Sequence, residues 1–135
     1  MQVGCPHTRN APYAELAGTG GPTGNSSFKT KSGQVIKRDG EGNIPDEFTK
    51  KFSNEPYTLS MANTGAPNSG GSQFFINTVH NDFLDWWRSD LSESQHPVFG
   101  RVIDGKDVIK KIENVPTSDD VPRNPVKIIS ATVVN

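Results

Sequence analysis

The sequence predicts a mainly β protein, built as a small antiparallel β-barrel or sandwich with few short helices. Short stretches with alternating apolar residues are separated by turns, which is typical of such folds. The 135 residues include 13 glycines and 10 prolines, which favour turns and short strands over long helices. The length suggests one domain covering residues 1–135, and no repeat or linker pattern divides it.

The first half of the chain is expected to be largely irregular. Residues 1–3 fit the end of a strand, and residues 7–33 carry no clear pattern. The glycine-rich loop at 18–22 is not followed by a helix, so phosphate binding is not favoured there. A short strand is expected at 34–36. A leading proline followed by acidic residues and lysines predicts a helical turn over 45–52.

The second half carries the stronger patterns. Apolar residues at helical spacing predict one helix over 106–113. Residues 115–123 contain two prolines and are expected to form a loop. Alternating or β-rich segments predict four strands, at 57–61, 73–78, 96–102 and 126–134.

The stretch from Leu59 to Thr78 is the first candidate for a binding site. It reads as two strands joined by a loop of small residues, which leaves room for a ligand beside the backbone. An apolar floor there would seat a ring-like side chain, and polar groups at the rim would hold an extended peptide. An ordinary barrel core with a polar rim explains the pattern equally well. The groove candidates are Met61, Ala62, Asn63, Gln73, Phe75, Phe83, Leu84 and His96.

Composition and charge exclude several other classes of function. The formal net charge of −1 gives no bulk electrostatic case for binding nucleic acid or an anionic membrane. No apolar run approaches membrane-spanning length, and the first residues carry no apolar signal region. A single cysteine, Cys5, excludes an intrachain disulfide and suits a reducing compartment. We therefore expect a cytoplasmic protein that requires no cofactor.

Other reactive groupings favour structural explanations. His80, Asp82 and Asp85 lie close in sequence without metal-ligand spacing, which favours a solvated polar loop and no metal. Ser72 lacks the strand–turn–helix context of an activated nucleophile. Cys5 is expected to be a small packed residue.

The adjacent Trp86 and Trp87 raise the question of ligand stacking. In an extended segment the two rings would point to opposite faces, so both cannot enter one core. Structural packing of the segment 82–95 is the favoured interpretation.

Four motifs together resemble the cyclophilin-type peptidyl-prolyl cis-trans isomerases, in a style close to prokaryotic members. They are Leu59–Asn63, Gly71–Ile76, Phe83–Asp85 and His96–Val102, and the similarity extends over essentially the whole chain. The resemblance implies a closed antiparallel barrel capped by two helices. It also implies acceleration of X-Pro bond rotation in protein folding, with proline-containing peptides and unfolded proteins as partners.

The resemblance also implies roles for individual residues. Phe75 would form the floor of a proline pocket lined by Met61 and Leu84, with His96 at its edge. The catalytic assignments are Phe75, His96 and Gln2. The residues expected to contact the peptide backbone are Gln2, Ala62, Asn63 and Gln73. A neighbouring pocket would hold the side chain upstream of proline, and the residues around it are Thr19, Gly20, Thr64 and Ser72.

Phe83 stands where many members carry a tryptophan that contacts cyclosporin, so weakened cyclosporin binding is expected. The segment 86–95 and the loop 25–43 are longer than in compact members. The family's catalytic arginine and opening strands would precede Met1, so the domain is expected to be incomplete at its N-terminus.

Two functions stay open at this point. The first is a prolyl isomerase, and the second is a non-catalytic module that binds proline peptides because the arginine is absent. Loss of one preorganised donor costs on the order of 10²–10³ in rate, so these 135 residues alone would show weak or no activity. The isomerase is favoured because it is the family's activity.

Overall fold

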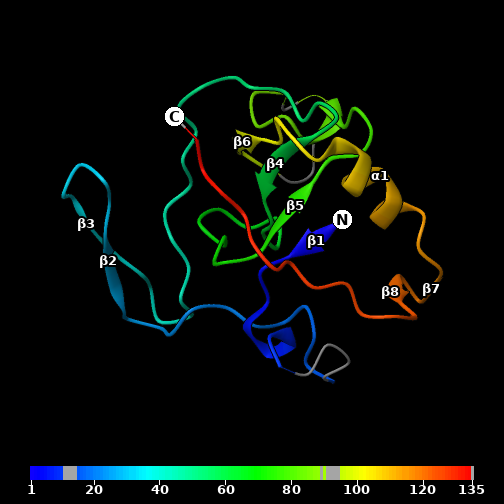
Figure 1. Cartoon of the computed structure of the whole chain (residues 1–135). Helices are drawn as coiled ribbons and strands as arrows, with labels where there is room; N and C mark the ends of the chain where they lie inside the picture. Colours follow the sequence, from blue (N-terminus) through cyan, green and yellow to red (C-terminus); the bar gives the residue numbers. More distant parts are fainter. Residues whose placement is uncertain (11–14, 89, 91–94, 135) are drawn as a thin grey trace.

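A computed structural model describes residues 1–10, 15–88, 90 and 95–134 as a mainly β fold. Its centre is a four-stranded antiparallel sheet in the order β1 (Gln2–Val3), β5 (Phe74–Ile76), β4 (Thr58–Met61) and β6 (Val98–Arg101), as Figure 1 shows. The fold class is therefore confirmed. The described strands leave this sheet open and do not close into a barrel.

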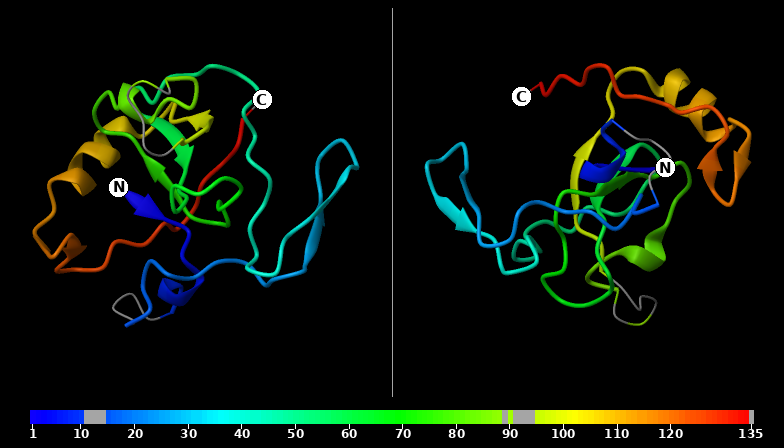
Figure 2. Two further views of the ribbon diagram at one scale, coloured as in Figure 1. Left: turned by 180° about the vertical axis from the view of Figure 1, so that it is seen from behind. Right: turned by 90° about the horizontal axis from the view of Figure 1, so that it is seen from below.

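Two small hairpins and one α-helix complete the described structure. Strands β2 (Ser27–Lys29) and β3 (Val35–Lys37) form a hairpin that stands away from the central sheet in Figures 1 and 2. Strands β7 (Thr117–Ser118) and β8 (Val121–Pro122) pair after helix α1 (Lys106–Glu113). The short 3₁₀ helices η1 (Pro6–Thr8) and η2 (Asp82–Leu84) follow β1 and β5. No helix in the described residues has the length and apolar character needed to cross a membrane.

The register of the sheet decides which side chains share a face. Phe75 is paired with Gln2 on one side and with Ser60 on the other, and directly paired residues point the same way. Met61 is paired with Phe74 and so lies on the opposite face. On that opposite face Phe74 meets the Phe99 ring edge-on at a centroid distance of 5.7 Å.

The most deeply buried side chains on the Phe75 side of the sheet are polar. Asn54 and Ser60 are 0% exposed, and Asn77 is 1% exposed. Their hydrogen bonds satisfy one another, because Ser60 Oγ donates to Asn54 Oδ1 at 2.6 Å and Asn77 Nδ2 donates to Ser60 Oγ at 3.0 Å. Such a network is tolerated in a core only when its members are paired. It fixes β4 and β5 against the segment that contains Asn54.

The helix at 106–113 is confirmed to the residue, and strands β4, β5 and β6 lie within the ranges predicted for them. The predicted helical turn at 45–52 is wrong, because the segment contains no helix and tertiary bonds fix its start. Asp46 N–H donates to Asn68 Oδ1 at 2.9 Å, and Asn68 N–H donates back to Asp46 Oδ2 at 2.7 Å.

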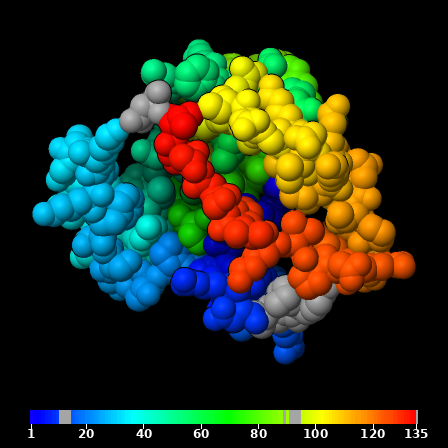
Figure 3. Space-filling view, viewed as in Figure 1, coloured from blue at the N-terminus to red at the C-terminus, as the bar shows by residue number. Residues whose placement is uncertain are grey.

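Two further predictions are corrected. The segment 126–134 contains no strand, and it runs across one face of the molecule in Figure 3 with side chains such as Ile129 exposed. The ranges 7–33 and 115–123 were expected to be irregular, yet they contain β2 and the β7–β8 hairpin. These short strands depend on cross-strand partners such as Phe28 and Ile36 rather than on an alternating pattern.

Candidate functional site

Phe75 and His96 form an aromatic corner on one face of the central sheet, where Phe75 belongs to the inner strand β5. Their rings meet edge to face at a centroid distance of 5.3 Å. The backbone of His96 is held on both sides, because its N–H donates to Leu84 O at 3.1 Å and its carbonyl accepts from Asn54 Nδ2 at 3.3 Å. Its ring Nδ1 lies 2.8 Å from Met61 O. The position of the imidazole is therefore fixed by three separate segments.

A cavity of about 440 Å³ opens where β1, β4 and β5 meet the loops. This volume is in the range of pockets that hold small ligands or peptide side chains. The cavity is lined by Gln2, Gly18, Thr19, Gly20, Gly21, Glu41, Asn43, Ala62, Asn63, Thr64, Ser69, Gly71, Ser72 and Gln73. Most of the lining residues are small or polar, which suits a site that binds polar groups of a peptide's backbone and side chains.

The Gln73 side chain ties the glycine-rich loop to the sheet. Its Nε2 donates to Gly18 O at 2.7 Å and to Gly20 O at 2.9 Å, and its Oε1 accepts from Gln2 Nε2 at 2.9 Å. Ser72 Oγ adds a bond to Gly4 O at 2.8 Å. One amide therefore sets the spacing between both sides of the cavity.

Asn63 holds the opposite rim. Its Nδ2 donates to Gln95 O at 2.6 Å, and its Oδ1 accepts from Gly65 N–H at 3.0 Å. The first bond anchors the residue that precedes His96, so Asn63 links the cavity to the aromatic corner.

Most of the residues singled out from the sequence meet at this place. Those that line the one cavity are Gln2, Thr19, Gly20, Ala62, Asn63, Thr64, Ser72 and Gln73. Phe75 and His96 are in ring contact, and the Leu84 carbonyl binds the His96 backbone. Their roles toward a ligand stay predictions.

Met61 and Phe83 are placed differently from the rest. Met61 lies on the other face from Phe75 and lines a small separate crevice with Ile44, Pro45 and Pro97. Side chains alternate between the two faces along a strand, and this alternation is the sequence signal that places Met61 and Phe75 on different faces. Phe83 is 49% exposed on η2.

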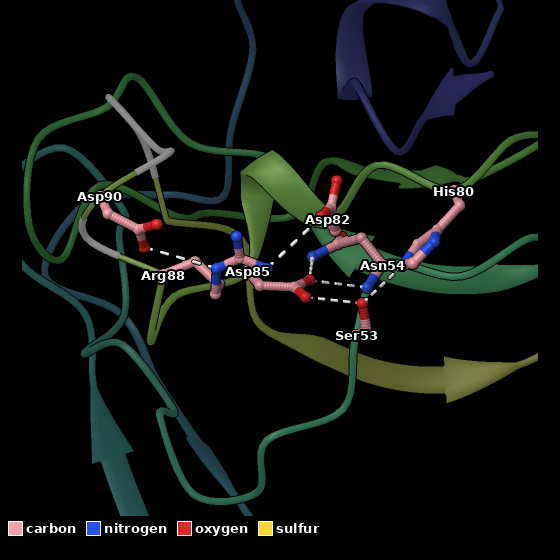
Figure 4. A network of polar contacts seen from close by, with 7 residues as sticks. All are labelled: Ser53, Asn54, His80, Asp82, Asp85, Arg88 and Asp90. Carbon is pink, nitrogen blue, oxygen red and sulfur yellow. Dashed lines mark hydrogen bonds and ion pairs between the residues drawn. The ribbon is translucent and has the colours of Figure 1, made fainter.

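Asp85 anchors the aromatic corner from behind, and the sequence did not indicate this. Its Oδ1 accepts from the backbone N–H and the side-chain Nδ2 of Asn54, both at 2.8 Å, and its Oδ2 accepts from Ser53 Oγ at 2.6 Å. Figure 4 shows these side chains converging, with His80 Nε2 2.9 Å from Ser53 Oγ. At 3% exposure, Asp85 is not part of a solvated loop, so that prediction is wrong for this residue.

The surrounding charges fit a structural network rather than a metal site. Arg88 lies between Asp82 and Asp90, at 3.4 Å from each carboxylate (Figure 4). Across the described ranges, no three His, Cys, Asp or Glu side chains are grouped so that they could hold a metal ion.

The tryptophan pair and the cysteine are packed, as the sequence predicted. Trp86 stacks on Phe48 at 5.0 Å and meets Trp87 edge-on at 5.6 Å. Cys5 is 8% exposed. Burial raises the pKa of the Cys5 thiol, but backbone hydrogen bonds, including one from Gly18 N–H at 3.3 Å, outweigh burial and lower this pKa overall.

The turn 39–43 closes the far side of the cavity. The Asp39 carboxylate accepts from Asn43 N–H at 2.8 Å, Glu41 N–H at 2.9 Å and Asn43 Nδ2 at 3.1 Å. The backbone bond from Asn43 is the main reason why the pKa of Asp39 lies below its ordinary value. The turn therefore depends on an ionised Asp39.

Acid should loosen this turn. The pKa of Asp39 is lower in the folded than in the unfolded chain. The stability that the ionised carboxylate gives to the turn is therefore fully present above the unfolded-state pKa, and it is lost as the pH falls through the folded-state pKa. We expect the amide protons of Glu41 and Asn43, followed by NMR, to shift with a midpoint below the ordinary aspartate value. An Asp39→Asn variant should not show this transition. A midpoint at or above the ordinary value would contradict the assignment.

Comparison with known proteins places this geometry in context. The model of the family described as cyclophilin type peptidyl-prolyl cis-trans isomerase/CLD matches residues 5–133. A peptidyl-prolyl cis-trans isomerase of Acinetobacter baylyi is 46% identical over 95 residues, which cover 67% of this chain and 49% of that protein. Peptidyl-prolyl cis-trans isomerase B of Escherichia coli is 43% identical over 95 residues, covering 67% and 58%. The chain thus spans about half the length of these curated relatives.

A solved structure supports the fold. The crystal structure of a Cryptosporidium parvum cyclophilin type peptidyl-prolyl cis-trans isomerase, determined in the presence of the dipeptide Ala-Pro, superposes with a TM-score of 0.56. The match covers 90% of this chain and 58% of that one at 24% sequence identity. The described strands therefore follow the arrangement of a known fold, although they form only part of it.

Proposed function

The chain belongs to the family of cyclophilin-type peptidyl-prolyl cis-trans isomerases, and on this premise we propose that it accelerates rotation about X-Pro peptide bonds. The observation that carries the proposal is the cavity beside the Phe75–His96 corner, since Gln2 of β1, the connection between β4 and β5, the glycine-rich loop and the turn 39–43 converge there. The proline ring packs against the aromatic corner, and the neighbouring residues of the peptide lie along the cavity. The proposed substrates are proline-containing peptides and unfolded proteins.

The proposed mechanism needs no nucleophile. The C–N bond of a peptide has partial double-bond character, and its rotation faces a barrier of about 18–20 kcal/mol. Holding the proline ring still while the preceding carbonyl swings favours the twisted state, in which resonance is lost. An apolar corner formed by Phe75 and His96 excludes water from the bond, and Gln73 and Asn63 keep the groove walls at a fixed spacing.

None of the residues that line the cavity in the described part of the chain is an arginine that could donate to the twisted nitrogen. Arg38 donates to Gly42 O, and Arg88 binds two aspartates outside the cavity. We therefore expect catalysis by these 135 residues to be slower than that of an arginine-bearing relative by on the order of 10²–10³.

Location and inhibitor binding are parts of the same proposal. A single, unpaired cysteine supports a cytoplasmic protein. The exposed Phe83 ring lacks the N–H donor of an indole, which supports weakened binding of cyclosporin.

Exchange NMR on a proline tetrapeptide tests the activity. We expect the chain to raise the cis–trans exchange rate above the uncatalysed value, which corresponds to tens to hundreds of seconds. Gln73→Glu should reduce this gain at least tenfold, because a carboxylate would face the carbonyls of Gly18 and Gly20. Gln34→Glu, at an exposed position between β2 and β3, is the matched control and should behave as the parent chain.

Two results would count against the proposal. A peptide that binds without faster exchange would show a non-catalytic binding module. A peptide that neither binds nor exchanges faster would remove the groove as a proline site.

A further inference from the structure

Glu41 is the one charged side chain among the residues that line the cavity in the described part of the chain. The other lining residues are glycines, an alanine and neutral polar residues. A neutral polar wall does not discriminate between charged peptides, so Glu41 supplies whatever charge preference this cavity has. Glu41 lies in the turn 39–43, between β3 and β4.

The backbone around Glu41 is fixed against the cavity. Gly42 has a φ of +90°, and a Cβ there would lie 2.1 Å from Pro22 O, so the turn packs directly on the loop beside the glycine-rich segment. Ile44 N–H donates to Gly70 O at 2.8 Å, which anchors the end of the turn on the loop between β4 and β5. The backbone of Glu41 is thus held at the rim of the cavity.

The neighbouring charges do not neutralise this rim. Arg38 follows β3, and its guanidinium donates to Gly42 O at 3.2 Å and lies over the Phe28 ring at 4.8 Å. The lysines of the β2–β3 hairpin are Lys29, Lys31 and Lys37, and no ion pair among the described residues joins a basic side chain to Glu41. Asp39 adds a second carboxylate, which accepts hydrogen bonds from the turn itself. Among the described residues, the Glu41 carboxylate accepts one hydrogen bond, from Asn43 Nδ2 at 3.3 Å. Because the Asn43 amide is neutral, this hydrogen bond does not cancel the negative charge of Glu41.

We infer that this cavity selects clients with a lysine or arginine at one of the two positions preceding proline. The inference rests on the proposed function, and it names the substrate class that the cavity favours. The basic side chain lies along the polar cavity and reaches Glu41, while the proline ring stays at the Phe75–His96 corner. Glu41 is solvent-exposed, so its effect on affinity is modest and screened by salt.

Titration of matched peptides tests this inference. The set consists of Ala-Lys-Pro-Phe, Ala-Glu-Pro-Phe and Ala-Ala-Pro-Phe with blocked ends, and a second set carries the charge one residue earlier. In at least one set we expect the lysine peptide to bind about fivefold more tightly than the glutamate peptide at low salt. Added salt should shrink this ratio.

Two variants distinguish an effect of the Glu41 carboxylate from an effect of the overall charge of the chain. Glu41→Gln should bring the lysine-to-glutamate ratio close to one, whereas Glu113→Gln, at the exposed end of α1, should leave the ratio at its original value. A ratio that survives in Glu41→Gln, or equal binding by the original chain in both sets, would overturn the inference.

The alanine peptide distinguishes the two levels of proposal. If it binds while charge makes no difference, only the inference about Glu41 fails. If none of the peptides binds, the proposed function fails as well.

Discussion

Replacing Asp85 with alanine is expected to lower the free energy of unfolding by about 3 kcal/mol. The change leaves the Asn54 N–H, the Asn54 amide and the Ser53 hydroxyl without their acceptor in a buried place. Each unsatisfied buried group costs roughly 1–3 kcal/mol. Urea unfolding followed by tryptophan fluorescence measures the loss, because Trp86 and Trp87 lie next in the chain.

The control for this change is Asp82→Ala on the same segment. Asp82 has a 45% exposed side chain and pairs with Arg88 at the surface, so its loss should cost less than about 1 kcal/mol. Equal effects of the two alanine variants would show that Asp85 does not anchor the corner. The Asp85 variant should also broaden or shift the His96 ring signals in NMR, since Asn54 holds the His96 carbonyl.

Replacing Phe75 with alanine is expected to weaken binding of a proline peptide by about 30-fold or more. The ring supplies one side of the aromatic corner, and loss of a large apolar contact costs about 2 kcal/mol or more. Titration of the chain with the blocked peptide Ala-Ala-Pro-Phe measures this loss of affinity directly. The expected change is in affinity, because no proton transfer is assigned to Phe75.

Phe99→Ala is the matched control for Phe75. Phe99 belongs to β6, is 53% exposed and contacts Phe74 on the opposite face of the sheet. It should alter stability but leave peptide affinity within about twofold of the parent chain. Comparable losses of affinity in both variants would contradict the assignment of the groove to the Phe75 face.

The sequence predicted the parts of the fold that have a strong local period. Helix α1 has Ile109 buried and its lysines exposed, and β4, β5 and β6 carry β-rich residues between turns. The strand predicted at 34–36 overlaps β3, whereas β2 was not predicted, because it is exposed and defined by pairing with β3, with Arg38 over Phe28 as support. The helical turn predicted over 45–52 is wrong because Asn68, which holds Asp46, lies 22 residues away and gives no local signal.

The candidate site was predicted through motif resemblance, and the errors in that prediction also come from reasoning by motif. Contiguous motifs such as Leu59–Asn63 name residues on both faces of a strand, so Met61 was grouped with Phe75 although the sheet separates them. Glu41 and Asn43 were missed because they reach the cavity only when the turn 39–43 packs on Pro22. The buried role of Asp85 depends on Asn54, 31 residues earlier in the chain.

In the proposed complex, the proline ring of the peptide rests against the Phe75–His96 corner. Intermolecular NOEs between the δ-protons of a bound peptide proline and the ring protons of Phe75 and His96 test it most directly. We expect cross-peaks to both rings in the parent chain, with none to Phe99 on the opposite face. Binding of the peptide with proline NOEs to Phe99, and none to Phe75 or His96, would contradict the account.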